Sequence, residues 1–435
     1  MDDKRRAGGY EICPYGVDGL CSTVQERNHA KLHCFSANFP LQEYAVCMII
    51  NSALNHQTRE DAPMTEFTQQ AQLGFGYLRV PMKDGKADPE VSNALVDRFL
   101  EKGYTYFDTA RGYMDEKSEE GLRECLVKRH PRESFRIADK LTIDYVASEA
   151  DILPFFESQL ERVGVEYFDY YLIHTLMAKN YPKFLDINAF EALKQLKAEG
   201  KVRHIGFSFH DTADLLEEIL KKHPEMEFVQ IQFNYEDFED PAIQSRRLYE
   251  VCEAYGKPVI VMEPLKGGNL TRLPEAAARI LSDLGGGSQA SYGLRFAASF
   301  PNIKMILSGM STLQDVDDNA AAISAGNPLT EEEFAAIGKV REILQAEQAV
   351  KCTACRYCVK GCPMDIPIPE IFSAYNTQMR YGGWNSKMYY SNSVRGKGRA
   401  SACIGCGACE DVCPQHLAIR EHLAAAAEMF DKKKA

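Results

Sequence analysis

Two related stretches near the end of the chain, 352-CTACRYCVKGCP-363 and 403-CIGCGACEDVCP-414, decide the fold of its last part. Each has the spacing C-x2-C-x2-C-x3-C-P, which puts three thiols on one tight loop and a fourth on the helix expected to follow. Three closely spaced thiolates can hold three irons of a cubane cluster, whereas the fourth is aimed elsewhere. The repeat therefore predicts a small, paired, cysteine-ligated domain.

This spacing is that of the bacterial [4Fe-4S] motif, in which the fourth cysteine of each run serves the other cluster. The expected ligands are Cys352, Cys355, Cys358 and Cys413 for one cluster, and Cys403, Cys406, Cys409 and Cys362 for its twin. Zinc is the alternative, but zinc sites usually show two C-x2-C pairs rather than an evenly spaced triple with a fourth Cys and Pro. Disulfides are a further alternative, disfavoured because nothing upstream looks secretory.

The segment between the two motifs is basic. Residues 371–409 contain no acid, and their basic residues are Arg380, Lys387, Arg395, Lys397 and Arg399. Positive charge beside anionic clusters would offset repulsion between thiolates, or it would attract an acidic electron carrier. A solvated insert between the motifs is the alternative.

Composition limits the class of protein. The chain of 435 residues is 45% hydrophobic and 26% charged, as in an ordinary soluble globular protein. A net charge of -12 argues against general nucleic-acid binding. No apolar run approaches the roughly 20 residues of a membrane span, so we expect neither a membrane location nor a signal peptide. Because eight of the fourteen cysteines lie in the two motifs and the rest are scattered, we expect a reducing, cytoplasmic location.

From residue 70 onward, short β-rich runs alternate with amphipathic segments of helical length. The runs span residues 73–80, 105–110, 135–141, 167–174, 202–210, 228–235, 258–264 and 304–310. Eight such runs, each followed by a helix, are what a (β/α)8 TIM barrel requires. A doubly wound open sheet is the alternative, but no G-x-G-x-x-G opens the first unit. We therefore expect a TIM barrel followed by a small, α-rich domain like a bacterial ferredoxin.

The expected domain organisation has four parts. They are an N-terminal extension that is poorly ordered (1–65), the barrel (66–328), a linking helix (329–350) and the iron-sulfur domain with a C-terminal helix (351–435). The extension contains six further candidate metal ligands, Cys13, Cys21, Cys34, Cys47, His29 and His33. Their spacing matches no ligand motif, so a disordered tail is favoured over a metal site.

Four polar residues stand at or just beyond the ends of consecutive β runs, where barrels place reactive groups. Asp108 ends the second run and Tyr113 follows it, Lys140 lies near the end of the third, and His174 ends the fourth. A buried Lys needs an anionic partner, so we expect Asp108 to hold Lys140, whose ammonium makes the Tyr113 phenol more acidic. His174 would orient a carbonyl oxygen that Tyr113 protonates during reduction. Singly, each residue also has a structural explanation, but their placement on successive strand ends favours one shared site.

The segment 106-YFDTARGY-113, together with Lys140 and 171-YLIH-174, resembles the motifs of the aldo-keto reductases for their Asp, Tyr, Lys and His tetrad. The likeness covers about residues 73–325. With the cysteine motifs, the chain resembles a bacterial subgroup in which a reductase barrel is fused to a ferredoxin-type domain. The resemblance implies that Asp108, Tyr113, Lys140 and His174 are catalytic.

The resemblance also implies contacts to a nicotinamide cofactor. The implied contacts are Ser208 and Gln230 to the carboxamide and Asn319 to adenine, with Asp318 before it. Separately, the backbone amides of Gly267, Gly268, Gly309 and Ser311, in the loops after the last two strands, are candidates to cradle a phosphate as TIM barrels often do, with ordinary loop geometry as the alternative. Three positions depart from the family pattern. Met262 replaces a Tyr that stacks on nicotinamide, Phe209 replaces an amide side chain, and Asp315 replaces a basic residue near the 2'-phosphate. A carboxylate would repel that phosphate, so NAD(P)H is an open expectation in which NADP is disfavoured.

Three functions remain open. The first is an oxidoreductase that interconverts a carbonyl and an alcohol, with electron transfer through two [4Fe-4S] clusters. The second is a reductase that ignores nicotinamide and takes electrons only from a ferredoxin or flavodoxin. The third is a non-catalytic electron-transfer scaffold, against which the complete tetrad counts. The expected partners are a small-molecule carbonyl or alcohol and an electron carrier, with no nucleic acid and no membrane.

Overall fold

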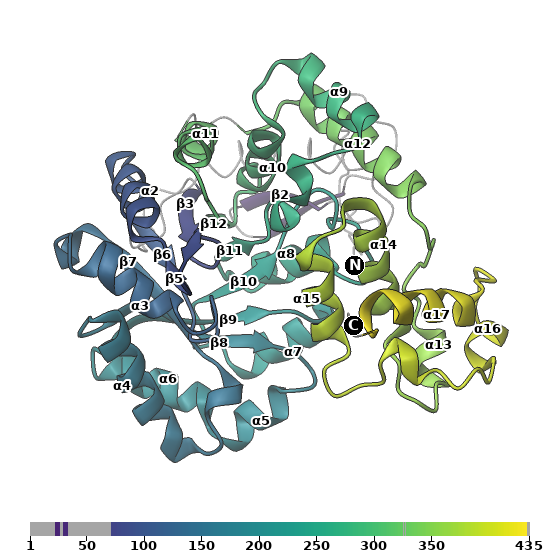
Figure 1. Cartoon of the computed structure of the whole chain (residues 1–435), viewed down its shortest axis with the longest axis horizontal. Helices are drawn as coiled ribbons and strands as arrows, with labels where there is room; N and C mark the ends of the chain where they lie inside the picture. The colour runs from purple at the N-terminus through teal and green to yellow at the C-terminus, as the bar shows by residue number, and fades with distance from the viewer. Residues whose placement is uncertain (1–21, 27–28, 34–70, 325, 327, 433–435) are drawn as a thin grey trace, which may run out of the picture.

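The computed structural model describes residues 22–26, 29–33, 71–324, 326 and 328–432, and its largest part is a closed barrel of eight parallel strands (Figure 1). In chain order the strands are β3 (Gln72–Gly76), β6 (Tyr106–Asp108), β7 (Arg136–Leu141), β8 (Phe168–Leu176), β9 (Val202–Phe209), β10 (Phe228–Gln232), β11 (Val259–Met262) and β12 (Ile303–Ser308). Each strand pairs with its neighbours in sequence, and β12 pairs with β3 to close the ring. The predicted (β/α)8 barrel is therefore confirmed, and the open-sheet alternative is excluded.

The interior of the barrel is filled by an apolar layer that is two inward positions deep on β8 and β12. Its buried members are Tyr106, Ala138, Tyr170, Leu172, Phe228, Ile260, Met305 and Leu307. Successive side chains on a strand point to opposite faces, so a residue two positions later also points inward, nearer the carboxyl ends of the strands. Asp108, Lys140, His174 and Gln230 each stand two positions after a member of this layer. The strand period thus places polar residues directly above the apolar floor.

Helices cover the outside of the barrel, because the apolar side of each one packs against the outward face of the strands. In α2 (Pro89–Glu101), for example, Leu95, Val96 and Phe99 are buried, and Asp88 caps the first turn by accepting from two backbone amides. The other covering helices are α3 (Ser118–Leu122), α4 (Ile152–Val163), α6 (Ala189–Ala198), α7 (Ala213–Lys222), α8 (Ser245–Ala254), α10 (Gln289–Ala298) and α11 (Leu313–Ser324). Across the residues described, no helix combines the length and apolar character that crossing a membrane requires.

A second, smaller core lies after the barrel. Before it comes α12 (Glu331–Ala346), whose buried side chains belong to the barrel's core, and which begins with a capping box in which Thr330 and Glu333 exchange hydrogen bonds. It is followed by α13 (Tyr357–Lys360), α14 (Ile368–Tyr381), α15 (Trp384–Ser393), α16 (Ala408–Asp411) and α17 (Ile419–Phe430). These helices share a core of their own and are grouped at one side of the barrel (Figure 1).

The N-terminal extension contains one feature that the sequence analysis did not anticipate. Strands β1 (Ser22–Glu26) and β2 (His29–His33) form an antiparallel pair. The cysteines considered there as metal ligands, Cys13, Cys21, Cys34 and Cys47, lie outside the described residues.

We predict that Gly206→Ala destabilises the barrel. Gly206 lies opposite Phe228 in the β9–β10 register, and an added Cβ would stand 2.5 Å from the Phe228 carbonyl oxygen. Overpacking against backbone should cost about 1–3 kcal/mol, measured as a lower midpoint of thermal unfolding. Gly338→Ala is the matched control, because Gly338 lies within α12 with open space around it and Ala favours a helix by about 1 kcal/mol. Equal midpoints for the two variants would contradict the close packing at Gly206.

Candidate active site and cluster-binding residues

Lys140 is the centre of the polar layer above the apolar floor. Its side chain is fully buried, and its Nζ donates to Asp108 Oδ2 at 2.8 Å and to the Thr109 carbonyl oxygen at 2.6 Å. Tyr113, from the loop after β6, turns back over it, so that Nζ lies 4.8 Å from the centroid of the phenol ring. The structure thus brings Asp108, Tyr113 and Lys140 together, although they come from two strands and a loop.

His174 completes the group from β8. Its ring meets the Tyr113 ring edge to face, with centroids 5.9 Å apart. A hydrogen bond of 2.7 Å joins His174 Nδ1 to Thr142 Oγ1, which fixes the plane of the imidazole. Thr142 was not among the predicted site residues, although it directly follows β7, two positions after Lys140.

Burial and one ammonium group decide the protonation of this site. Burial raises the pKa of Tyr113, and the Lys140 ammonium opposes that rise. Burial, followed by the same positive charge, holds the pKa of His174 well below its ordinary value. Burial alone would lower the pKa of Lys140, but Asp108 and Tyr113 outweigh it and the net pKa is raised. At neutral pH the site therefore holds an ammonium, a protonated phenol and a neutral imidazole, which suits proton donation by the phenol.

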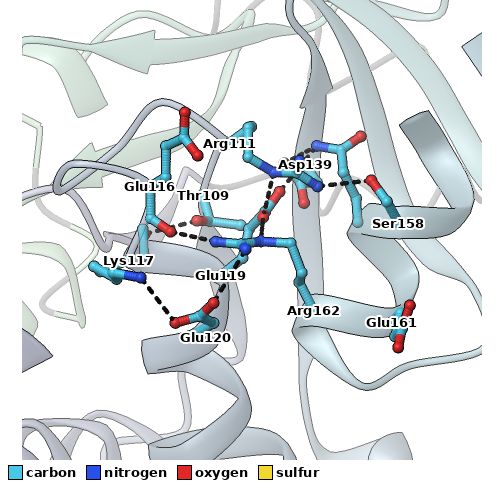
Figure 2. A network of polar contacts seen from close by, with 12 residues as sticks. Thr109, Arg111, Glu116, Lys117, Glu119, Glu120, Asp139, Ser158, Glu161 and Arg162 are labelled. Atoms are coloured by element: carbon cyan, nitrogen blue, oxygen red, sulfur yellow. Dashed lines mark hydrogen bonds and ion pairs between the residues drawn. The ribbon is translucent and has the colours of Figure 1, made fainter. Parts of the chain in front are cut away.

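A buried network stands behind Lys140 (Figure 2). Gln159 Nε2 donates to the Lys140 carbonyl oxygen at 3.2 Å and to Asp139 Oδ1 at 3.0 Å. The buried Glu119 accepts from Arg111 Nε at 2.7 Å and from Arg162 Nε at 2.6 Å. Because these residues join α3 and α4 to the end of β7, the network holds the backbone from which the Lys140 side chain projects.

Two of the residues implied for nicotinamide face the same end of the barrel. Ser208 Oγ accepts from the Thr175 backbone amide at 2.7 Å. Gln230 Nε2 lies 3.7 Å from the sulfur of Met262, and its Oε1 is buried with no hydrogen-bond partner in the part of the chain described. Phe209 is buried in the outer core instead of facing the site.

The residues implied for the dinucleotide's other end are engaged within the protein. Asn319 Nδ2 donates to Ser308 Oγ at 2.9 Å. Asp318 Oδ2 accepts a hydrogen bond of 2.6 Å from the hydroxyl of Ser288, the N-cap residue of α10. At Gly309, an added Cβ would lie 3.0 Å from the Arg79 side chain. The Arg79 side chain therefore already covers Gly309.

The eight motif cysteines line two hollows in the C-terminal domain. The cysteines at the first hollow are Cys352, Cys355, Cys358 and Cys413, and those at the second are Cys403, Cys406, Cys409 and Cys362. Each hollow is therefore lined by three thiols of one motif and the last thiol of the other. Apolar side chains such as Phe372 and Leu423 complete the walls. Four soft thiolate donors around an apolar hollow fit an iron-sulfur cluster.

The basic segment between the motifs is anchored largely by its own charges. Arg380 Nη1 lies 2.5 Å from Glu236 Oε1 in the barrel, and Arg395 Nη1 lies 3.1 Å from Asp144 Oδ2. Arg399 forms an ion pair of 2.6 Å with Asp431, just after α17. The first two contacts join the segment to the barrel, so Arg380 and Arg395 have a docking role, whereas Arg399 pairs within the C-terminal domain.

Comparisons with known proteins match this organisation. A model of the aldo/keto reductase family matches residues 72–342, and a model of a 4Fe-4S dicluster domain matches residues 351–418. Both parts of the resemblance noted from the sequence are thereby confirmed.

Individual relatives match the barrel. D-galacturonate reductase of Fragaria ananassa is 31% identical over 211 residues, which are 44% of this chain and 62% of that protein. The 9,11-endoperoxide prostaglandin H2 reductase of Trypanosoma cruzi is 34% identical over 200 residues, which are 45% of this chain and 62% of that protein. The chain thus spans less than two thirds of the length of these relatives.

Solved structures match the fold. Aldo-keto reductase AKR11C1 from Bacillus halodurans has a TM-score of 0.52 at 24% identity, covering 62% of this chain and 92% of that one. An aldo/keto reductase from Klebsiella pneumoniae, solved with NADP and acetate, has a TM-score of 0.52 at 22% identity, covering 63% of this chain and 95% of that one.

We predict that Cys413→Ser damages the same cluster as Cys352→Ser, and that Cys362→Ser damages the same cluster as Cys403→Ser. The reason is that each hollow draws its fourth thiol from the other motif. Anaerobic iron and sulfide analysis should fall from about eight to about four atoms per chain in every variant, and the spectra should agree within each pair. Cys252→Ser, which changes a buried thiol of the barrel, should keep the full iron content. Spectra that agree for Cys413→Ser and Cys403→Ser instead would contradict the crossed arrangement.

Proposed function

The chain belongs to the aldo/keto reductase family, and from that premise we propose an oxidoreductase that interconverts a carbonyl and an alcohol in its barrel and exchanges electrons through two [4Fe-4S] clusters. The observation that carries the proposal is the contact of Tyr113 with both Lys140 and His174 at the carboxyl end of the strands. This is the end of a TIM barrel at which active sites are found. The substrate would be a small molecule that reaches Tyr113 between the surrounding loops.

Tyr113 is assigned the proton transfer. Reduction of a carbonyl takes two electrons and two protons. Tyr113 supplies the proton that goes to oxygen, the reductant supplies both electrons, and the second proton, drawn from water, goes to carbon. The tyrosinate left behind is stabilised by the Lys140 ammonium, which Asp108 and the Thr109 carbonyl oxygen hold in place. His174, a neutral imidazole fixed by Thr142, orients the substrate oxygen. In the oxidation direction the same tyrosine takes the proton back.

The cysteines of the two hollows are assigned to the clusters, which when bound supply electrons one at a time. Cys355 and Cys406 are exposed, so each hollow comes close to the surface of the domain. A protein electron carrier such as a ferredoxin or flavodoxin can approach these edges and is the proposed partner. Such clusters require reducing surroundings, which favours a cytoplasmic location.

We predict that Tyr113→Phe lowers carbonyl reduction by at least about 100-fold, because the proton donor is lost. The assay would use the anaerobically purified protein with reduced methyl viologen as electron source and a panel of aldehydes as substrates. The cluster absorbance should not change. Tyr167→Phe is the matched control, since Tyr167 stands just before β8, at the opposite end of the barrel, and contacts Arg203. A Tyr113→Phe protein with the activity of the control would remove Tyr113 from the acid role.

We predict that loss of the Lys140 charge moves the pH profile of alcohol oxidation upward. Oxidation needs the phenolate, and the ammonium favours it by lowering the pKa of Tyr113 against the effect of burial. Removing that charge raises the pKa of Tyr113 further. The limb of the profile on which the rate of oxidation rises with pH should therefore move to higher pH. Activity at pH 8 should then fall about tenfold for every pH unit by which the limb moves. The double variant Asp108→Asn/Lys140→Met avoids an unpaired buried charge. Asp108 raises the pKa of Tyr113 by less than Lys140 lowers it, so the limb should move upward in the double variant too, but less than in Lys140→Met. A limb that moves in neither variant would contradict the role of Lys140.

A further inference from the structure

The loops after the seventh and eighth strands of a TIM barrel are a common place for a bound phosphate. In this chain they follow β11 and β12, and they include Gly267, Gly268, Gly309 and Ser311. A nicotinamide dinucleotide would need these loops for its pyrophosphate. Four observations show that the protein's own groups already occupy them.

Helix α15 covers the loop after β11. The Asn385 side chain is 6% exposed, and its Nδ2 donates to the Gly267 carbonyl oxygen at 2.8 Å. Gly267 has a positive φ of 64°, and an added Cβ there would overlap the Asn385 amide. The amide of α15 therefore lies directly on the backbone that a phosphate would approach. Tyr389, from the next turn of α15, donates to Glu263 Oε2 at 2.7 Å in the same loop.

Arg79 closes the space between the two loops. Its Nη2 donates to Asn385 Oδ1 at 2.8 Å and lies 3.6 Å from Glu263 Oε1. Its guanidinium lies 5.8 Å from the centroid of the Trp384 ring, and its aliphatic part covers Gly309. A guanidinium at this position would be the natural partner of a phosphate, but here it binds α15 and an acidic residue.

The backbone amides at the start of α11 already bind a carboxylate of the protein itself. The backbone amides of Ser311 and Thr312 both donate to Asp315 Oδ2, at 2.9 Å and 3.0 Å. Amides at a helix N-terminus form the usual site for a phosphate. In this chain an internal carboxylate takes that place, and its charge would repel a phosphate brought beside it.

A second cation of the region, Lys266, is also paired. Lys266 lies in the loop after β11, is buried, and forms ion pairs with Asp237 and, at 3.6 Å, with Glu236. Glu236 in turn binds Arg380 at 2.5 Å and accepts from Tyr381 at 2.9 Å, so residues just before α15 take part in the same cluster. The carboxylates around Arg79 and Lys266 therefore already balance the positive charge that a pyrophosphate would need.

We infer that the protein, with its two domains docked, excludes nicotinamide dinucleotides. Helix α15 covers the loop that would hold the pyrophosphate, and Asp315 occupies the amides at the start of α11 where a further phosphate would bind. The cations that would hold these phosphates, Arg79 and Lys266, are already paired within the protein. The residues do not fit the cofactor that the family resemblance implies. This inference rests on the proposed function in one respect: the two electrons for the carbonyl then enter one after the other through the cysteine-bearing domain, from a one-electron protein carrier, and the proton that goes to carbon comes from water.

The test is direct binding of NADPH and NADH to the full chain, purified anaerobically with its clusters and titrated by calorimetry without substrate. The expected result is no saturable binding with a Kd below about 1 mM. Trp384 is the only tryptophan of the chain and lies on α15, so its emission reports separately whether that helix moves. Saturable binding of either nucleotide by the unmodified protein with a Kd below about 1 mM would overturn the inference.

A second measurement asks whether the named groups cause the exclusion. The double variant Asn385→Gly/Asp315→Ser uncovers Gly267 and frees the amides of Ser311 and Thr312, and we expect NADPH to bind at least about tenfold more tightly than to the unmodified protein. Asp315→Ser alone should show a smaller gain, and it serves if the double variant does not fold. Lys387→Ala, an exposed change on the same helix, is the matched control and should match the unmodified protein.

If the double variant binds NADPH no more tightly than the unmodified protein, then α15 and Asp315 are not the groups that exclude the nucleotide. This outcome is separate from failure of the proposed reaction. Binding is measured without turnover, whereas the reaction is tested by the activity of Tyr113→Phe.

Discussion

The site depends on one ion pair, between a fully buried ammonium and the carboxylate of Asp108. An unpaired charge buried inside the barrel would carry a large desolvation free energy. Lys140 stays protonated because Asp108 and the Thr109 carbonyl oxygen accept hydrogen bonds from its ammonium group. The same ammonium acts on the pKa of Tyr113 and helps to keep His174 neutral. Removing this pair would therefore change the protonation of the whole group, whereas the apolar layer beneath it would keep its packing.

The position of the C-terminal domain follows from a different kind of interaction. Polar and charged side chains of α14 and α15 reach the loops after several barrel strands, as in the pairs of Arg380 with Glu236 and Tyr389 with Glu263. Such contacts hold one orientation, since each charge left without its partner would be poorly solvated. They also explain why this domain covers the loop after β11, whereas Cys355 and Cys406 remain at the surface.

The parts that could be predicted from the sequence are those encoded by local periods. Eight β-rich runs indicated the barrel, and the period of two along each strand links Asp108 to Tyr106 and Lys140 to Ala138 on one inward face. Contacts between distant loops carry no such signal. Arg79 and Asn385 are 306 positions apart, and neither residue type stands out where it occurs. Asp315 was noted as a departure from the family pattern, but only the structure shows its carboxylate capping α11.

The order of the segments has a consequence for assembly. Helices α14 and α15 lie in the stretch of chain that joins the two cysteine motifs, and each hollow takes thiols from both sides of that stretch. A metal group held by both sets of cysteines would therefore tie the two ends of this stretch together in a closed loop. The closed loop has less conformational freedom, so α15 would lose less of it on packing against the barrel. Occupation of the two hollows and the seating of α15 on the loop after β11 are thus thermodynamically linked, so a chain with empty hollows would hold α15 less firmly than a loaded one.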